Sequence, residues 1–575
     1  MKKTIISLLL IVLLATSTLF ASGVKETTSK VTTATATKVA VSADVTVNLA
    51  SATADNEKVS VSVTDEGNIQ ITNKTDSEMS VELTGSFNGT VIIKSSTDMT
   101  LIMNGVQIKA STLPAIQLKG DVTYTFYLPQ GSSSVVSDSS DNEKKGAITA
   151  DGSVVIDGQG SFNLNVYKKH GFKLDGGLTI NGGNVVITGD SLAEGNMVSA
   201  DLWFVMNDGT LTINANGSVH ASESKGIKVN GVEGYDGHSG YVEINGGTIN
   251  ITSVGKAITA GWKASEDATT EATSDDPDPS VFINGGTVTI KTTGTPYEYS
   301  DEESLSPEGI EGKNSVVING GTVDIDTTDD SINAGNLLQF NGGVVYARAS
   351  MNDCIDSNGT LEVNGGTVVA LCKTGGAEQA IDCDSNSNFS YTGGTFVGLG
   401  GGNNTPASSA TSAYSIACGS NSYKGGDQIA VLDSDGKVVA GFIVPSDFSS
   451  GSCLIIGSQS IEKSKTYTLA KGTFKGAVTV NGVVQSCTSF TSSSTLGSYT
   501  MNSYVQSSGY TGMNMGPQGG QGGQRGQFGP FGQNGQQGFP GNPPDGNFDP
   551  SNFDPSNRPE PPQGGFPQGG FPGRF

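Results

Sequence analysis

Residues 306–366 read SPEGIEGKNSVVINGGTVDIDTTDDSINAGNLLQFNGGVVYARASMNDCIDSNGTLEVNGG, and this stretch decides the fold because it holds one pattern three times. The triplet Asn-Gly-Gly begins at Asn319, Asn341 and Asn364, so the unit returns after 22 and then 23 residues. A short apolar segment precedes each triplet, and a segment that alternates between apolar and polar residues follows it, which indicates strands with one buried side. Asn-Gly tolerates the positive φ of a tight turn. A short repeat made only of strands and turns predicts a parallel β-helix.

A second feature precedes each triplet by eleven residues: a polar residue, a small residue, an isoleucine and a polar residue, as in Glu308-Gly-Ile-Glu. A later copy starts at Gln379. Equivalent positions of successive coils stack at about 4.8 Å. The polar residues are therefore predicted to form two columns, one of Glu308, Asp330 and Asp353 and the other of Glu311, Asn333 and Asp356. Because stacked acids repel each other, a cation is expected between them.

The composition fits a solenoid and excludes some partners. The chain has 575 residues, 80 of them glycine, with 15% charged residues and a formal net charge of −24. Many glycines and few charges are typical of a turn-rich, all-β protein, and a solenoid can be long and still form one unit. The negative charge argues against nucleic acid, whose phosphates would be repelled. No GxxxxGKS/T loop, HExxH or CxxC motif occurs.

The N-terminus has the features of a secretory signal over residues 1–21. Two lysines precede an apolar run from Ile5 to Leu14 that is too short to span a membrane, and small residues follow, with cleavage expected near Ala21. No later apolar stretch is long enough to cross a bilayer. We therefore expect an exported protein, secreted or associated with the cell surface, monomeric and without an integral membrane segment.

The composition divides the chain into five parts. They are the signal peptide (1–21), a flexible leader rich in Thr and Ser (22–44), the β-helix (45–402), a small β cap (403–500) and a Gly/Pro/Gln-rich tail (501–575). The cap is expected to cover the open C-terminal end of the solenoid. The tail cannot form a core, so we expect it to be disordered.

Six cysteines occur, all in the second half of the chain. An even number in an exported protein allows three disulfides, whose pairing the spacing does not fix. For Cys354, Cys372 and Cys383, an equal alternative is that they are small residues stacked in the solenoid wall.

Residues 308–336, EGIEGKNSVVINGGTVDIDTTDDSINAGN, resemble the bacterial carbohydrate-binding family of polysaccharide-lyase-like β-helix proteins. The similarity covers roughly residues 45–475 and includes Asp435-Gly-Lys and Lys465-Thr-Tyr-Thr-Leu. The resemblance implies a right-handed parallel β-helix, related in fold to pectate lyases. It also implies binding of calcium, cellulose and acidic sugars, without lyase activity as a hallmark. The tail and the cysteines depart from the family's pattern.

The acidic columns are candidate calcium ligands, because hard oxygen ligands at about 2.4 Å can come from neighbouring coils. Calcium would also let carboxylates of the protein and of an acidic polysaccharide share one ion. The alternative is solvated acids on an acidic surface. The predicted ligands are Glu308, Glu311, Asp330 and Asp353, with Asp329 and Asp356 as lesser candidates and Asn333 as a neutral oxygen. Arg348 is predicted to lie beside Asp326 as a surface ion pair.

Two lysines occupy the same column farther upstream. Lys225 and Lys256 each precede an inward isoleucine by two residues, as Glu308 does. A polysaccharide lyase would use one of them as the base that removes the proton beside a uronate carboxyl, with calcium acidifying that proton. We favour instead an ion pair between Lys256 and Glu308 across coils. His170, at the same position several coils earlier, is predicted to be a surface histidine.

Long intervals between turn motifs predict loops within 231–240 and 264–279, and a third over 293–307. Sugar rings stack on aromatic side chains through their apolar C–H faces. Four aromatic residues in or next to these loops are therefore candidate carbohydrate contacts: Trp262, Tyr235, Tyr297 and Tyr299. Trp203, in the apolar run Leu-Trp-Phe-Val, is predicted to lie in the core.

Three functions compete. The first is an exported, non-catalytic, calcium-dependent protein that binds plant-type or acidic polysaccharides, such as cellulose or an acidic glycan. The second is a calcium-dependent, pectate-type lyase, and the third is a structural or adhesive surface protein. We favour the first, because no arginine or lysine is tied to the acidic columns by more than one plausible neighbour. With three histidines and no recognisable triad, hydrolysis by a nucleophilic serine has no support. Glycoside hydrolysis by paired carboxylates stays open, since two columns could give the required separation.

Overall fold

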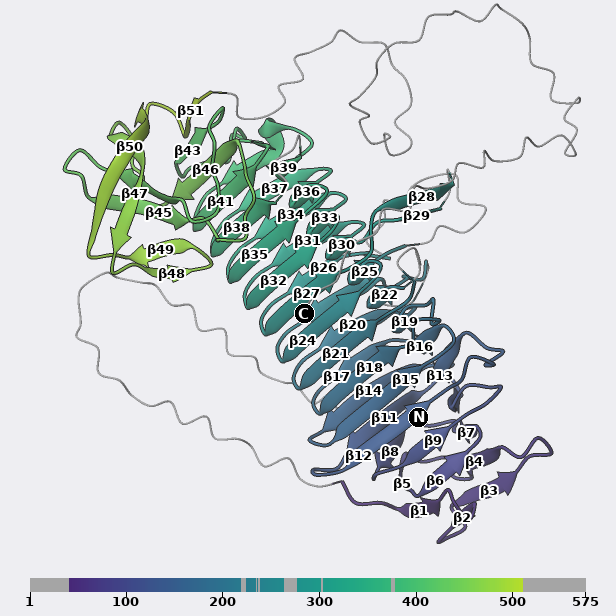
Figure 1. Ribbon diagram of the computed structural model, residues 1–575. Helices are drawn as coiled ribbons and strands as arrows, with labels where there is room; N and C mark the ends of the chain where they lie inside the picture. The colour runs from purple at the N-terminus through teal and green to yellow at the C-terminus, as the bar shows by residue number, and fades with distance from the viewer. Residues whose placement is uncertain are drawn as a thin grey trace, which may run out of the picture. The chain divides into compact units, whose positions relative to one another are not determined.

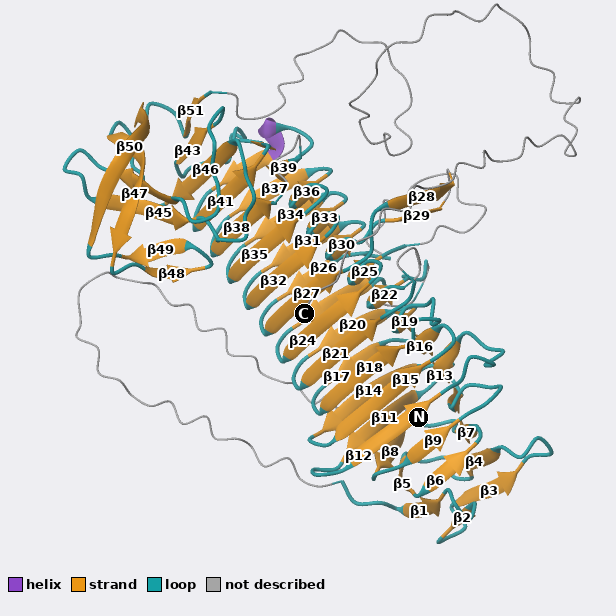
Figure 2. Cartoon of the chain, in the orientation of Figure 1, coloured by secondary structure: helices purple, strands orange, loops and turns teal. Residues whose placement is uncertain are grey.

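The computed structural model describes residues 41–218, 224–233, 235, 238–262, 277–300, 303–373 and 378–509. Their strands stack into three sheets, here called A, B and C, which wrap one core as a parallel β-helix (Figure 1). Strands dominate throughout (Figure 2), and the one helical element in the described part is the 3₁₀ turn η1 (Asn386–Asn388). The predicted all-β solenoid is confirmed. The predicted signal peptide, nearly all of the leader and the tail beyond 509 lie outside the described residues.

Each coil runs through sheet A, then C, then B. Sheet A has 14 strands in the spatial order β2 (Thr53–Ala54), β1 (Val45–Asn48), β5 (Met79–Thr84), β8 (Met99–Met103), β11 (Thr123–Leu128), β14 (Ser153–Gly158), β17 (Leu178–Ile180), β20 (Trp203–Met206), β23 (Tyr241–Ile244), β26 (Val281–Ile283), β31 (Ser315–Ile318), β34 (Leu337–Phe340), β37 (Thr360–Val363) and β40 (Phe389–Tyr391).

Sheet B also has 14 strands, in the order β3 (Val59–Val63), β4 (Ile69–Asn73), β7 (Val91–Lys94), β10 (Ile116–Lys119), β13 (Gly146–Ala150), β16 (His170–Leu174), β19 (Val198–Ala200), β22 (Ile227–Val229), β25 (Ile258–Ala260), β30 (Ile310–Gly312), β33 (Ile332–Ala334), β36 (Ile355–Ser357), β39 (Gln379–Ile381) and β42 (Gly402–Asn403).

Sheet C has 15 strands, in the order β51 (Val505–Ser508), β43 (Ser415–Cys418), β46 (Cys453–Ser458), β41 (Thr395–Gly400), β38 (Thr367–Cys372), β35 (Val344–Ala349), β32 (Thr322–Thr327), β27 (Thr287–Thr292), β24 (Thr248–Ser253), β21 (Thr210–Ala215), β18 (Asn184–Gly189), β15 (Ser161–Val166), β12 (Ser133–Ser137), β9 (Gln107–Lys109) and β6 (Ser86–Asn88).

The core forms because each coil repeats the same inward positions. Ile310 pairs with Ile332, and Ile332 pairs with Ile355, so the isoleucines of the acidic motif stack in one row, each at most 1% exposed. Fully burying such a side chain contributes about 1.5–3 kcal/mol. Parallel pairing already begins with β1, which pairs with β5. Strand β1, which begins at Val45, is therefore already part of the parallel stack.

The Asn-Gly-Gly triplets form the corner between sheets A and C. Gly343 has φ +77°, and a Cβ added there would lie 2.7 Å from the backbone of Gly320 in the preceding coil, so this position requires glycine. The asparagines form a ladder along the stack. Each amide donates from Nδ2 to Oδ1 of the preceding coil over 2.8–3.1 Å, in a series made of Asn181, Asn207, Asn245, Asn284, Asn319, Asn341 and Asn364.

Replacing Asn341 with alanine is expected to destabilise the solenoid by about 1–2 kcal/mol. The variant loses the bonds that Asn341 donates to Asn319 and Gln339 and the bond that it accepts from Asn364. Because Asn341 is exposed, water replaces part of that loss. Chemical denaturation of Asn319→Ala, Asn341→Ala and the double variant measures the effect. The two variants share one bond, so the double variant should lose less than the sum, and strict additivity would contradict the ladder.

The C-terminal cap closes one edge of the solenoid and covers part of one face. Strand β46 pairs antiparallel with β41 and so covers the edge of the last coil, and sheet C continues from β46 through β43 to β51. The outward residues Leu371 and Leu399 are buried in a second apolar core that they share with the cap. A six-stranded sheet completes the cap, in the order β48 (Val478–Val480), β49 (Val483–Ser486), β45 (Val438–Ile443), β44 (Gln428–Leu432), β47 (Thr466–Lys475) and β50 (Ser489–Thr500). Strand β51 pairs with β43, so the ordered cap extends past residue 500, where the tail was predicted to begin.

Five of the six cysteines are buried, and Cys354, Cys372 and Cys383 belong to the core of the solenoid. Cys354, Cys372 and Cys383 therefore pack as small residues in the solenoid wall, which was one of the two alternatives drawn from the sequence. Cys418 and Cys453 are buried as well, and Cys487 is half-buried.

Candidate functional site

The acidic motif lies on sheet B, where the register places its members as predicted. Glu311 pairs with Asn333 in the next coil, and Asn333 pairs with Asp356 in the one after. The backbone N–H of Gly309 donates to the carbonyl of Asp330, which aligns the residues before each isoleucine as well. The acids are nevertheless far less exposed than a surface column would be. Glu308, Glu311, Asp329 and Asp330 are 3–6% exposed.

Lys256 bridges two of these acids. Its Nζ lies 2.8 Å from a carboxylate oxygen of Glu308 and 2.7 Å from one of Glu311. Burial alone would lower the pKa of Lys256, but the two carboxylates outweigh it and raise that pKa, so the lysine stays charged. The predicted ion pair between coils is confirmed, and Glu311 is a second partner that the sequence did not indicate.

The two glutamates differ because they have different numbers of cationic partners. Glu311 also contacts Lys313, and the two lysines overcome burial and hold the pKa of Glu311 below its usual range. Among the described residues, Lys256 is the one cation that contacts Glu308, and burial raises the pKa of Glu308 to about 7. The second carboxylate oxygen of Glu308, Oε2, is buried without a hydrogen-bond partner. Glu311 is therefore fully neutralised by the protein, whereas Glu308 is only half satisfied.

The next coils carry an aspartate cluster without a lysine, which we define as Asp329, Asp330, Asp353, Asp356 and Asp382. Burial, then the neighbouring acids, raises the pKa of Asp330 well above its usual value. Burial likewise raises the pKa of Asp353 to about 8 and that of Asp356 to about 7, with Asp382 adding to both. Asp382 was not among the predicted site residues, although it belongs to the later copy of the motif that begins at Gln379.

The polar partners of the aspartate cluster are neutral. Asn352 donates to Asp329 over 2.8 Å, and the backbone N–H of Gln379 donates to Asp353. Asn333 donates to Oδ2 of Asp330 over 3.3 Å, while Oδ1 of Asp330 is buried without a partner. Buried carboxylates that lack both a cation and a full set of donors carry a free-energy cost that a bound cation or a proton would remove.

The cluster consists of oxygen donors, which are the ligands that calcium prefers. Among the described residues, no three Asp, Glu, His or Cys side chains converge in a ready metal-binding arrangement. The two unpartnered oxygens, on Glu308 and Asp330, nevertheless fit a hard cation. The donor chemistry thus agrees with the predicted calcium site, and binding would require carboxylates to reorient toward the ion.

Other predicted charged residues lie elsewhere than expected. Arg348 pairs with Asp324, not with Asp326, although Asp326 is its register partner; Lys373 takes Asp326 instead. The guanidinium of Arg348 also lies 4.5 Å from the ring centroid of Tyr346. This cation–π contact draws the guanidinium away from Asp326, its direct register neighbour. His170 is not a surface histidine: it is 7% exposed, and its Nδ1 accepts the backbone N–H of Asn196 over 2.9 Å.

The predicted carbohydrate contacts differ in exposure. Tyr235 is 36% and Tyr297 49% exposed. Trp262, which follows β25, is half-buried, and its Nε1 is buried without a partner. The side chain of Tyr299, in the hairpin of β28 (Tyr297–Ser300) and β29 (Glu303–Leu305), lies outside the described residues.

Trp203 is not in the core, contrary to prediction. It is half-buried and faces outward from β20, while its neighbours Leu202 and Phe204 are buried. The indole lies next to Tyr241 of the following coil, with ring centroids 6.5 Å apart and planes 21° from parallel. The run Leu-Trp-Phe-Val is apolar throughout, so the sequence did not show which residues face the core.

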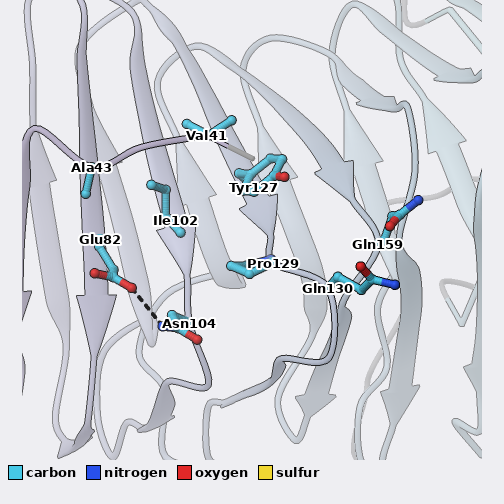
Figure 3. A pocket seen from close by; sticks show the side chains of 9 residues that line it. All are labelled: Val41, Ala43, Glu82, Ile102, Asn104, Tyr127, Pro129, Gln130 and Gln159. Carbon is cyan, nitrogen blue, oxygen red and sulfur yellow. Dashed lines mark hydrogen bonds between the residues drawn. The ribbon is translucent and has the colours of Figure 1, made fainter. Parts of the chain in front are cut away.

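A pocket of about 430 Å³ opens on the outer face of sheet A at the first coils (Figure 3). Side chains from neighbouring coils line it, and Asn104 donates to Glu82 over 2.7 Å. The lining residues are Val41, Ala43, Glu82, Ile102, Asn104, Tyr127, Pro129, Gln130 and Gln159. Amides, one carboxylate and a phenol ring suit a ligand rich in hydroxyl groups.

The described residues contain no helix long and apolar enough to cross a membrane.

Comparison with known proteins indicates a family. The sequence model of a family described as carbohydrate-binding domain-containing protein matches residues 65–353, which is half of the chain and includes the Lys256 network, Asp329, Asp330 and Asp353. Among solved structures, the chain is similar to the polysaccharide lyase-like protein from C. thermocellum, determined as a gadolinium derivative. The two are 18% identical over 56% of this chain and 97% of that chain, with a TM-score of 0.33. No curated protein matches the sequence.

Proposed function

The chain belongs to the carbohydrate-binding domain-containing protein family, and we propose that it is an exported, non-catalytic protein that binds acidic polysaccharide through calcium on sheet B. Carbohydrate binding follows from the family, and the ligand class, the ion and the export are the proposal. The observation that carries it is the pair of buried, unpartnered carboxylate oxygens on Glu308 and Asp330. They mark the point where the acidic columns lack a positive charge.

Calcium explains how an acidic protein binds an acidic chain. With a formal net charge of −24, the protein repels a polyuronate unless a cation lies between them. The residues that would hold the ion are Asp330, Asp353 and Asp356, with Glu308 and Asp329 at one end. When bound, calcium would neutralise these carboxylates and offer open coordination positions to a uronate carboxylate. Glu311, which was also a predicted ligand, already has two lysine partners and is the weakest candidate.

The state of Lys256 favours binding over catalysis. A lyase needs a base whose pKa lies near the working pH, so that it can accept a proton. The two glutamates push the pKa of Lys256 upward, away from that range; the lysine is half-buried and both of its glutamate partners are buried. We therefore infer that Lys256 is a structural cation. Export rests on the signal-like residues 1–21, which also agree with an extracellular glycan as the ligand.

We expect the protein to be retained on immobilised polygalacturonate in the presence of calcium and released by excess chelator. The Asp330→Asn, Asp353→Asn double variant should lose the calcium-dependent retention. Glu57→Gln, Asp121→Asn is the matched control, because it removes the same charge from exposed positions far along the chain. If chelator does not release the protein, and the double variant is retained as well as the native protein, the proposed site is wrong. The same mixtures should show no rise in the absorbance of unsaturated uronates, and a rise that Lys256→Met abolishes would identify a lyase.

A further inference from the structure

The outer face of sheet A carries apolar side chains where a solvent-facing sheet is normally polar. Half-buried apolar residues occur in two neighbouring columns of outward positions. One column holds Val155, Val205, Phe282 and Val317, with Thr179 and Glu243 between them, and the other holds Trp203, Tyr241 and Leu337, with Ser280 and Ser315 before Leu337. The asparagine ladder runs parallel to them, two residues farther along the strands. The face therefore combines aromatic, aliphatic and amide columns over a width of about 13 Å.

Trp203 is held flat against the sheet. A Cβ added to Gly177, its partner in the preceding coil, would lie 2.3–2.4 Å from three atoms around the indole ring fusion. The five-membered ring therefore covers the bare Cα of this glycine. The indole N–H is already used, since Nε1 donates to Oγ1 of Thr179 over 3.2 Å. What the side chain can offer a ligand is its carbon surface.

Two further rings lie close to parallel beside the indole. Tyr241 is 21° from parallel with Trp203, and His238 is 26° from parallel with Tyr241 at a centroid distance of 5.1 Å. Asp278 contacts Nε2 of His238 at 3.4 Å and so orients the imidazole. The ring planes are thus fixed by packing before any ligand arrives, which lowers the entropy lost on binding.

The charges on this face select a neutral ligand. No outward position on the sheet A strands from β17 to β37 holds a lysine or an arginine, and these strands are described in full. Glu243 and Asp278 are the acids next to the aromatic rings. A polyuronate would be repelled here, whereas a neutral polysaccharide presents apolar C–H faces to the rings and hydroxyl groups to the exposed amides of Asn207 and Asn245.

We propose that Trp203 and Tyr241 form a stacking platform for a neutral polysaccharide, separate from the acidic site on sheet B. The platform requires no calcium, because it holds no cluster of carboxylates. It goes beyond the proposed function by assigning a second binding site, with its residues, to a second sheet, and it stands or fails independently of the calcium site.

Tryptophan fluorescence tests the platform directly, because the chain contains two tryptophans. In a Trp262→Phe variant, Trp203 is the single reporter. Cellohexaose should shift its emission in a saturable manner, equally with calcium or with chelator. Trigalacturonate with calcium should leave the emission unchanged. In the reciprocal Trp203→Phe variant, Trp262 should not respond to cellohexaose. Absence of a response from Trp203, or a response from Trp262 alone, overturns the proposal.

Retention on insoluble cellulose supplies the matched comparison. Trp203→Ala and Tyr241→Ala should each weaken retention on the order of tenfold, which corresponds to about 1.4 kcal/mol. Gly177→Ala should weaken it too, because the added methyl group lifts the indole while both rings remain. Tyr167→Ala removes a 41% exposed ring elsewhere and should have no effect.

Each variant is also measured on polygalacturonate with calcium and by thermal unfolding. The platform variants should keep the native melting temperature and the calcium-dependent retention, so that loss of cellulose binding alone supports the platform. A variant that melts normally but loses both ligands shows one shared site and overturns the proposal. Failure of the native protein on polygalacturonate, with intact cellulose binding, removes the calcium proposal and leaves the platform standing.

Discussion

Replacing Lys256 with methionine should lower the free energy of unfolding by about 3–5 kcal/mol at pH 8, as expected when one partner of a buried ion pair is removed. Lys256 lies within 2.8 Å of Glu308 and Glu311, which are 6% and 3% exposed. Without it, Glu308 keeps no cation and Glu311 keeps the half-exposed Lys313 alone. Chemical denaturation of the native protein and the variant, followed by far-ultraviolet circular dichroism, measures the difference.

A compensated variant provides the control. Lys256→Met combined with Glu308→Gln and Glu311→Gln removes the lysine and both negative charges, so it should recover much of the lost stability. The deficit of the single variant should also shrink toward pH 5, because protonation neutralises the acids that lost their partner. An effect of Lys256→Met that is small, or that the two glutamine substitutions leave unchanged, would show that the ion network does not hold these coils together.

The second large effect concerns pH and calcium. Protein treated with chelator should melt several degrees higher at pH 5 than at pH 8. The sign follows from the raised pKa values of Glu308, Asp353 and Asp356, which are about 7, 8 and 7. Between their ordinary values near pH 4 and these raised values, the folded state binds more protons than the unfolded state, so stability falls as pH rises. Full stability from these groups is present at the acid end of that window.

Calcium should oppose this loss, because it binds the deprotonated carboxylates of the folded chain. Adding it should raise the melting temperature strongly at pH 8 and weakly at pH 5. The variant Asp330→Asn, Asp353→Asn, Asp356→Asn carries neutral groups of the same shape, so it should melt at least as high as the chelated native protein at pH 8 and ignore calcium. A native melting temperature that does not change with chelator at pH 8 rules out calcium at this cluster.

The repeat made the register of the site predictable. Each coil of the β-helix stacks on the one before it. Residues that lie the same number of positions from Asn-Gly-Gly in successive coils must therefore stack. Glu311, Asn333 and Asp356 accordingly lie side by side. The pairing of Lys256 with Glu308 followed from the same spacing. Glu311 as a second partner of Lys256 did not, because side-chain length and direction decide it within the register.

Burial of the acids could not be read from the sequence. The spacing shows that residues leave the strand on the outer side, but not whether other chain segments then cover them. The prediction for Trp203 was wrong for a related reason. When every residue of a strand is apolar, the alternation of its side chains does not show which of them face the core. Arg348 took Asp324 because contact with Tyr346 decided between two acids of similar distance, a choice that depends on three side chains at once.

The corner between sheets A and C has a consequence for how such a chain can change over evolutionary time. From β17 onward, three residues separate each sheet A strand from its sheet C strand, from Ile180 and Asn184 through Tyr391 and Thr395. The corners on either side of sheet B differ widely in length from coil to coil. Duplication of a whole coil preserves the amide ladder, and insertions survive at the other two corners. Such a chain can therefore lengthen its solenoid or elaborate the surroundings of sheet B separately, while the corner that carries the ladder keeps its length.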